Sequence, residues 1–182
     1  MMKTDALRLH VALLTADAFA PFGQVIEASD AVHHYSINEG NTERYHDLVR
    51  LDPGPQGRAI VSIFRGQPRA LPFEVRMMER HPLGSQAFMP LSARPYLVVV
   101  SAADETPRAD TLRVFLASGN QGVNYARGVW HHPLLALEAV SDFLVIDRQG
   151  EGANCDELLL AHPAWIEESA LRACDELVRP RD

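Results

Sequence analysis

The sequence predicts an all-β fold, a barrel or a sandwich, for a single domain of 182 residues. Short runs rich in Val, Ile and Phe recur at a spacing of roughly 8 to 12 residues, which is typical of such folds. Turns rich in Gly, Pro and Asn separate the runs, as at Asp52–Pro55 and Ser118–Gly122. The spacing does not suit alternating strands and helices, so a parallel βαβ sheet is not expected.

The predicted elements begin with a strand at Leu7–Leu14 and a helical turn at Thr15–Ala20, which Pro21 and Gly23 end. Further strands are expected at Gln24–Glu27, His33–Asn38, Arg44–Leu48, Arg58–Arg65, Phe73–Arg80, Gln86–Leu91, Tyr96–Ser101, Thr111–Ala117, Leu134–Val140 and Phe143–Asp147. A helix is predicted over Ala164–Val178, where Ile166, Ala170, Cys174 and Leu177 share one face. We expect this face to pack on the barrel or on a second subunit.

Composition excludes several classes of protein. The net charge of -7 and the pI of about 5.6 argue against nucleic-acid binding, which requires concentrated positive charge. No signal peptide or membrane-spanning run is recognisable, so a cytoplasmic protein without a membrane partner is expected. Cys155 and Cys174 have neither zinc-ligand nor CxxC spacing, and we interpret them as reduced structural thiols. Signatures of nucleotide, dinucleotide, zinc-protease and serine-hydrolase sites are missing from the sequence.

The first polar motif runs from Glu79 to Gln86, and Gly128-Val129-Trp130-His131 follows later in the chain. Glu79-x-His81-x4-Gln86 resembles the first metal-binding motif of the cupin barrel, His-x-His-x4-Glu, and the later turn resembles the second motif. Two histidines and one carboxylate can hold a divalent ion, whereas Gln86 is a weak ligand. Glu79, His81, Gln86 and His131 therefore form either a metal site or a metal-free, hydrogen-bonded cavity.

Other candidates surround this set. His131 and His132 are adjacent, so on a strand only one of them can enter the cavity, and the motif spacing favours His131. In Arg44–Leu48, alternation places Arg44 and His46 on one face, where Arg44 can bind a carboxylate and His46 can transfer a proton. A solvated hairpin with an Arg–Asp pair is the alternative. Arg65 ends a strand at a turn and is a second candidate for binding a carboxylate.

Several blocks resemble the ureidoglycolate lyase family, also known as ureidoglycolate hydrolase, in content, order and spacing. They are Asn38–Gly40 with Glu43–Leu48, Glu79–Phe88, Gly122–Tyr125, Val129–Leu134, Asp142–Leu144 and Ile146–Arg148. The resemblance covers about residues 7–156 and leaves 157–182 as a C-terminal helical extension. It implies a cupin-like, jelly-roll β-barrel, a homodimer, a late step of allantoin degradation and a link with nickel.

The residues suit the reaction that the resemblance implies, cleavage of ureidoglycolate to glyoxylate and urea. The substrate is a hemiaminal, so a base must take its hydroxyl proton and an acid must protonate the leaving nitrogen. We assign the base to His81 or His131, with Glu79 orienting it or relaying the proton. Binding of the carboxylate is assigned to Arg65 or Arg44, and binding of the ureido group to Gln86, Asn124 and Tyr125. The alternatives are an amidohydrolase that releases ammonia and carbon dioxide and a non-catalytic cupin that binds a small carboxylic acid.

Overall fold

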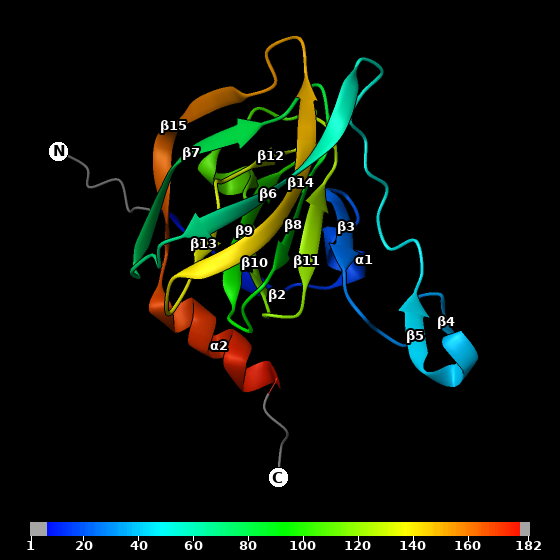
Figure 1. The fold of residues 1–182 in the computed structure, drawn as a ribbon. Helices are drawn as coiled ribbons and strands as arrows, with labels where there is room; N and C mark the ends of the chain where they lie inside the picture. Colours follow the sequence, from blue (N-terminus) through cyan, green and yellow to red (C-terminus); the bar gives the residue numbers. More distant parts are fainter. Residues whose placement is uncertain (1–6, 179–182) are drawn as a thin grey trace, which may run out of the picture.

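A computed structural model describes residues 7–178, with side chains through Cys174, and Figure 1 shows its fold. Two sheets curl around one core and form a barrel, which confirms the all-β prediction. The first sheet has the strand order β1-β15-β7-β12-β9-β10-β2, with β13 paired to β9. Its strands are β1 (Leu7–Arg8), β2 (Val11–Leu13), β7 (Phe73–Arg80), β9 (Tyr96–Ser101), β10 (Arg113–Ala117), β12 (Trp130–His131), β13 (Leu135–Ala136) and β15 (Asp156–Ile166).

The second sheet has the order β3-β11-β8-β14-β6. Its strands are β3 (Gly23–Ile26), β6 (Gly57–Gly66), β8 (Gln86–Pro90), β11 (Gly122–Tyr125) and β14 (Ser141–Gly150). The inner face of this sheet carries Phe88, Val123, Phe143 and Val145, all buried in the barrel core together with Phe19 of the short helix α1 (Ala16–Phe19). Thr15 caps that helix by accepting a hydrogen bond from the amide of Ala18, as the predicted helical turn requires.

The outer face of the second sheet is apolar as well. Strand register places Ile63, Leu144 and Met89 in one row and Val61 and Ile146 in the next. Val61 and Ile63 lie on the edge strand β6 and are 67% and 55% exposed. Burial of such a side chain stabilises a protein by about 1.5–3 kcal/mol, so covering this outer face would be favourable.

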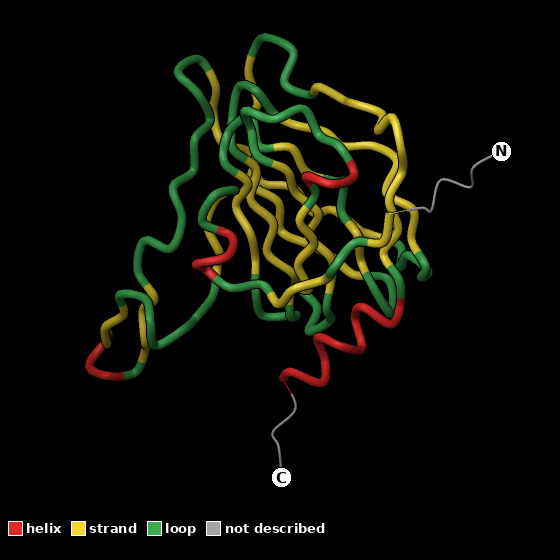
Figure 2. Tube along the Cα trace, turned by 180° about the vertical axis from the view of Figure 1, so that it is seen from behind, coloured by secondary structure: helices red, strands yellow, loops and turns green. Residues whose placement is uncertain are grey.

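A hairpin stands clear of the barrel in both views (Figures 1 and 2). It consists of β4 (His34–Ile37), the 3-10 turn η1 (Asn38–Gly40) and β5 (Thr42–Tyr45), and we call residues 34–45 the arm. β4 and β5 pair only with each other within the described part of the chain. The predicted strand Arg44–Leu48 is displaced toward the N-terminus, because Asp47 has a positive φ of 54° that ends the extended backbone.

The C-terminal segment differs most from the sequence prediction. Residues 157–166, predicted as part of a helical extension, belong to β15, which pairs with β7 of the barrel. The helix α2 is confined to Glu168–Val178, and Pro163 lies where the β15–β7 register shifts between Leu159 and Ala164. Ile166 therefore ends a strand. Cys174 packs in a second buried cluster with Leu97 and Val99, on the face of β9 opposite the barrel core, and donates to the carbonyl of Val11. Leu177 lies outside the described side chains.

Three smaller differences have local causes. The predicted first strand is divided into β1 and β2, and the predicted strand Leu134–Val140 shrinks to β13 because Glu138 has a φ of 64°. The segments that form β11 and the very short β12 are identified in the sequence as motifs and not as strands. The 3-10 turn η2 (Ala109–Thr111) ends at Thr111, where a strand is expected to begin, and β10 begins only at Arg113. Among the described residues, no helix has both the length and the apolar character needed to cross a membrane.

Candidate active site

Two cross-strand pairs build a polar cluster inside the barrel. Glu79 on β7 lies opposite His131 on β12, and Gln86 on β8 lies opposite Tyr125 on β11. Because the two sheets face each other, both pairs project toward the same interior, and His81 follows β7 in the turn beside them. We call Glu79, His81, Gln86, Tyr125 and His131 the interior cluster. The four residues predicted to converge in the barrel therefore do lie together.

Backbone contacts fix the proton of His81. Its Nδ1 lies 2.6 Å from the carbonyl oxygen of Asn154, which can only accept, so Nδ1 carries the hydrogen. Nε2 then faces the amide of Gln86, 3.1 Å away. A neutral His81 bonds the NH₂ of Gln86 through this atom, whereas a protonated His81 bonds the amide oxygen. The ring is held in place in both states and presents Nε2 to the cluster.

His131 follows the same rule. Its Nδ1 donates to the carbonyl of Val129 at 3.1 Å, and its ring stacks on Tyr125 with centroids 4.2 Å apart and planes at 6°. Nε2 lies 3.5 Å from Glu79 Oε1 and is buried without a hydrogen-bond partner. His132, by contrast, faces away and contacts the edge of Phe73, as strand alternation predicts. A buried nitrogen left open in this way is available to a ligand.

Glu79 supplies the negative charge of the cluster. Burial acts to raise the pKa of its carboxyl group, but the interaction with His131 and the nearby rings of His81 and His132 outweigh burial and lower this pKa. Glu79 is therefore a carboxylate at neutral pH. Burial and the charge of Glu79 together raise the pKa of Tyr125, which stays protonated and can donate a hydrogen bond.

The donor atoms of Glu79, His81 and His131 all lie within 4.8 Å of one another. Each histidine directs Nδ1–H to a backbone carbonyl and Nε2 to the cluster, which is the usual arrangement of metal-binding histidines. The geometry therefore fits both a divalent cation and a pair of proton-transfer groups around a small polar ligand.

The other predicted site residues lie elsewhere. Asn124 is on β11, but its amide donates to Gln24 at 2.8 Å and to the carbonyl of Arg50 at 3.1 Å, on the outer face of the sheet. Arg65 is bound by both carboxylate oxygens of Asp142, at 2.7 and 2.8 Å. Arg44 lies on the arm near the ring of Tyr35, and His46 follows β5. The structure thus brings together Glu79, His81, Gln86, Tyr125 and His131, and it leaves Asn124, Arg65, Arg44 and His46 outside.

Sequence comparison connects this cluster with known proteins. The family model described as ureidoglycolate lyase matches residues 6–167, nearly the whole chain. The chain belongs to the ureidoglycolate lyase family. It is 55% identical over 173 residues to a ureidoglycolate lyase of Burkholderia mallei (strain NCTC 10229), covering 94% of this chain and 98% of the relative. It is also 57% identical to ureidoglycolate lyase 1 of Rhizobium meliloti (strain 1021), covering 82% and 87%, and 51% identical to the enzyme named ureidoglycolate lyase in Pseudomonas syringae pv. syringae (strain B728a), covering 82% and 88%.

Two features of the site could not be predicted from the ureidoglycolate lyase motifs. The carbonyls of Val129 and Asn154 set which nitrogen of each histidine is protonated, but a backbone oxygen leaves no signal in the residue types. The Asp52 carboxylate accepts from Arg127 at 2.6 Å, and the Asp52 amide donates to the hydroxyl of Ser85 at 2.8 Å. These bonds tie the chain after the arm to the barrel rim, whereas the sequence marks Asp52 only as a turn residue.

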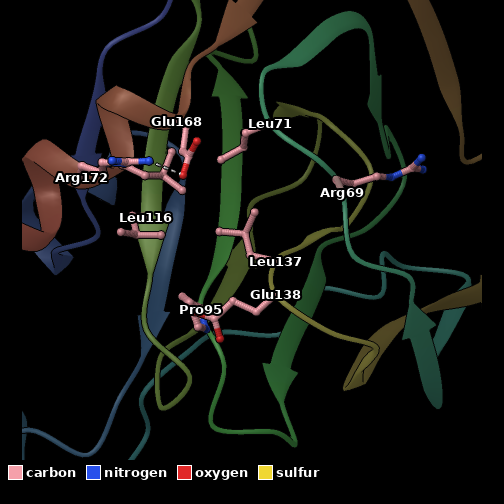
Figure 3. Close-up of a pocket in the computed structure, with 9 residues that line it drawn as sticks. Arg69, Leu71, Pro95, Leu116, Leu137, Glu138, Glu168 and Arg172 are labelled. Atoms are coloured by element: carbon pink, nitrogen blue, oxygen red, sulfur yellow. Dashed lines mark hydrogen bonds and ion pairs between the residues drawn. The ribbon is translucent and has the colours of Figure 1, made fainter.

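A groove of about 450 Å³ lies at a different place in this member of the ureidoglycolate lyase family, between α2 and the first sheet (Figure 3). Leu71, Leu116 and Leu137 form its apolar wall. Arg172 is paired with Glu168 at 2.8 Å, and Figure 3 shows the side chain of Arg69 pointing away from the leucines. Apart from Glu138, its charged lining residues are paired or turned outward, so the groove lacks the convergent polar groups of the interior cluster.

Proposed function

We propose that this protein is a ureidoglycolate lyase that cleaves ureidoglycolate to glyoxylate and urea in allantoin degradation. The observation that carries the proposal is the interior cluster, which lies in the matched region of the family and holds two histidines beside one carboxylate. Lyase chemistry on a hemiaminal needs one group that accepts a proton and one that donates it. The cluster offers both within a single buried site.

In the proposed reaction, His81 takes the hydroxyl proton of the substrate through Nε2, the nitrogen that faces the Gln86 amide. The oxygen electrons then form the carbonyl of glyoxylate while the carbon–nitrogen bond breaks. His131, held against the Glu79 carboxylate at 3.5 Å, delivers a proton to the departing urea nitrogen. The rings of the two histidines have centroids 5.1 Å apart, so the proton can return from His81 to His131 and complete the cycle.

The same nitrogens suit a divalent cation. Glu79, His81 and His131 would hold it, with Gln86 as a neutral neighbour, and the cation would polarise the substrate hydroxyl and lower its pKa. Nickel is the metal that the family resemblance implies. Gln86 and the protonated hydroxyl of Tyr125 are the groups of the cluster that can bind the ureido moiety.

One assay tests the reaction and the role of a metal. Purified protein is incubated with racemic ureidoglycolate, with and without a chelator, and glyoxylate, urea and ammonia are measured separately. We expect glyoxylate and urea in equal amounts. Ammonia in place of urea would identify an amidohydrolase, and binding without turnover would identify a non-catalytic protein. Activity that survives the chelator assigns both Nε2 atoms to proton transfer, whereas activity that the chelator abolishes and nickel restores assigns them to a metal.

We further propose a homodimer formed through the outer face of the second sheet. Its support is the apolar patch made by Val61, Ile63, Met89, Leu144 and Ile146, on a face that no helix of the described chain covers. A twofold dimer brings the same patch of both subunits together and covers both at once. A cytoplasmic location stays a prediction from the sequence.

A further inference from the structure

The interior cluster lacks a cation for the substrate carboxylate. Glu79 gives it negative charge, and of the arginines that the structure describes, only Arg44, Arg50 and Arg69 have neither a hydrogen bond nor an ion pair through their guanidinium groups. A buried carboxylate needs a paired cation, because an uncompensated charge is costly to remove from water. These three residues can bind the substrate carboxylate without giving up a hydrogen bond or an ion pair, and they are therefore the first candidates for the cation.

Two of the three lie outside the barrel of their own subunit. The charge of Arg69 acts on His132, which faces away from the cluster on the opposite side of β12. The charge of Arg50 acts on Asp52, and its carbonyl is bound by Asn124 on the outer face of the second sheet. Neither guanidinium is directed into the barrel, which leaves Arg44 on the arm.

The arm has the features of a segment that packs against another surface. An isolated two-stranded hairpin is at best marginally stable in water, yet this one stands away from its own barrel (Figures 1 and 2). It is held together by stacking of His34 on Tyr45 and by the rings of His33, Tyr35 and His46. Nδ1 of His46 is buried without a partner, and Tyr35 is 37% exposed. These side chains offer aromatic and polar contacts that its own barrel does not use.

The root of the arm lies on the face proposed for the dimer. Arg50 is fixed to Asn124 there, and the following Leu51–Pro53 segment lies beside Ile146. The six Cα-to-Cα steps from Arg50 to Arg44 can span up to about 20 Å, whereas packed sheets are about 10 Å apart. An arm rooted on this face is therefore long enough to pass the facing sheet of a second copy and reach the rim of its barrel.

We propose that the arm of each subunit lies across the partner and places Arg44 at the mouth of the partner's interior cluster, where it binds the substrate carboxylate. This inference rests on the proposed function and names a residue that completes the same site. Twofold symmetry makes the exchange mutual, so each of the two sites uses histidines from one chain and an arginine from the other.

Mixed dimers test the proposal. Two differently tagged chains, one carrying Arg44→Gln and one carrying His131→Ala, are coexpressed, and dimers with both tags are purified. If Arg44 acts on the partner, one site receives both substitutions and the other receives none, so the mixed dimer keeps about half of the wild-type kcat. If Arg44 acts within its own chain, every site is damaged and the mixed dimer is no more active than the parents, which overturns the proposal.

Controls distinguish a failure of the arm proposal from a failure of the proposed lyase reaction. A mixed dimer of Glu79→Gln and His131→Ala has one lesion in each chain's own cluster, so it should stay inactive in both cases. The Arg44→Gln homodimer should lose about 10- to 100-fold in kcat/KM, as expected for a lost charge-assisted hydrogen bond, and Arg44→Lys should recover part of it. Full activity of Arg44→Gln would overturn the arm proposal alone, whereas an inactive wild-type protein would overturn the lyase proposal and the arm proposal with it.

Discussion

The interior cluster and the arm hold their functional side chains in opposite ways. His81 and His131 are each fixed by a backbone carbonyl, and β12, which carries His131, is paired on both sides within the barrel. Arg44 lies on a hairpin whose two strands pair only with each other among the described elements. Under the proposals made above, the fold of one chain positions the two proton-transfer histidines, whereas Arg44 needs a second chain to position it at the substrate carboxylate.

Replacement of His131 by Ala should have the largest effect on kcat. A small effect would contradict the assignment of proton transfer to the interior cluster. The change removes the buried Nε2 beside Glu79, so we expect kcat to fall by about 10²- to 10⁴-fold, the usual value of one proton-transfer group. Glyoxylate and urea release measure the loss, and circular dichroism checks the fold. A folded variant with near-normal turnover would remove His131 from the mechanism.

Replacement of Glu79 by Gln should have the next largest effect, a loss of about 100-fold in kcat, because the variant keeps the size of the side chain but not its charge. Glu157 cannot serve as the control, because it lies opposite Glu79 and its carboxylate is within 4.8 Å of the Glu79 carboxylate. Glu105, exposed in the turn after β9, provides the control, and Glu105→Gln should leave kcat within about twofold of wild type. Equal losses in both variants would mean that the net charge of the protein, rather than the cluster, controls the rate.

Replacement of Ile63 by Asp tests whether the arm needs a second subunit in order to act. A charge in the middle of the proposed interface should weaken the dimer by about tenfold or more, and the monomers should lose activity as severely as Arg44→Gln. Leu159→Asp is the control, since Leu159 is 81% exposed and lies on the first sheet. Analytical ultracentrifugation gives the oligomeric state. A monomeric Ile63 variant with full activity would show that each chain completes its own site.

Titration of His132 should have the smallest effect. Burial lowers its pKa below the ordinary 6.5 and outweighs the hydrogen bond to Pro133 and the charge of Glu79, which act to raise it. The unfolded chain therefore binds a proton first as the pH falls below 6.5, and the free energy of unfolding decreases by at most about 1.4 kcal/mol per pH unit. His132→Asn should flatten this dependence between about pH 7.5 and 5.5 in urea denaturation, whereas replacement of the exposed His10 should preserve it.

Sequence alone predicts the strands whose local pattern is strong. Phe73–Arg80 and Tyr96–Ser101 have the predicted bounds, because continuous or alternating apolar residues determine them. The prediction of a helical extension is wrong over most of β15, since the pairing of β15 with β7 joins residues far apart in the chain and leaves no local signal. The motif spacing places the four cluster residues in one site. The local residue pattern does not determine that Asn124 turns to the outer face of its sheet or that Arg44 lies on a hairpin away from the barrel.

The carbonyls of Val129 and Asn154 have a consequence for how such a site evolves. A main-chain oxygen belongs to every amino acid, so substitutions at these two positions can keep the histidine tautomers as long as the path of the chain is preserved. Insertions or deletions in the loop between β14 and β15 would instead move the Asn154 oxygen and release the ring of His81. Homologous chains should therefore hold the loop to a constant length, while Val129 and Asn154 are constrained for other reasons, since Val129 is buried in the core and the Asn154 side chain accepts a hydrogen bond from the amide of Leu83 at 2.8 Å.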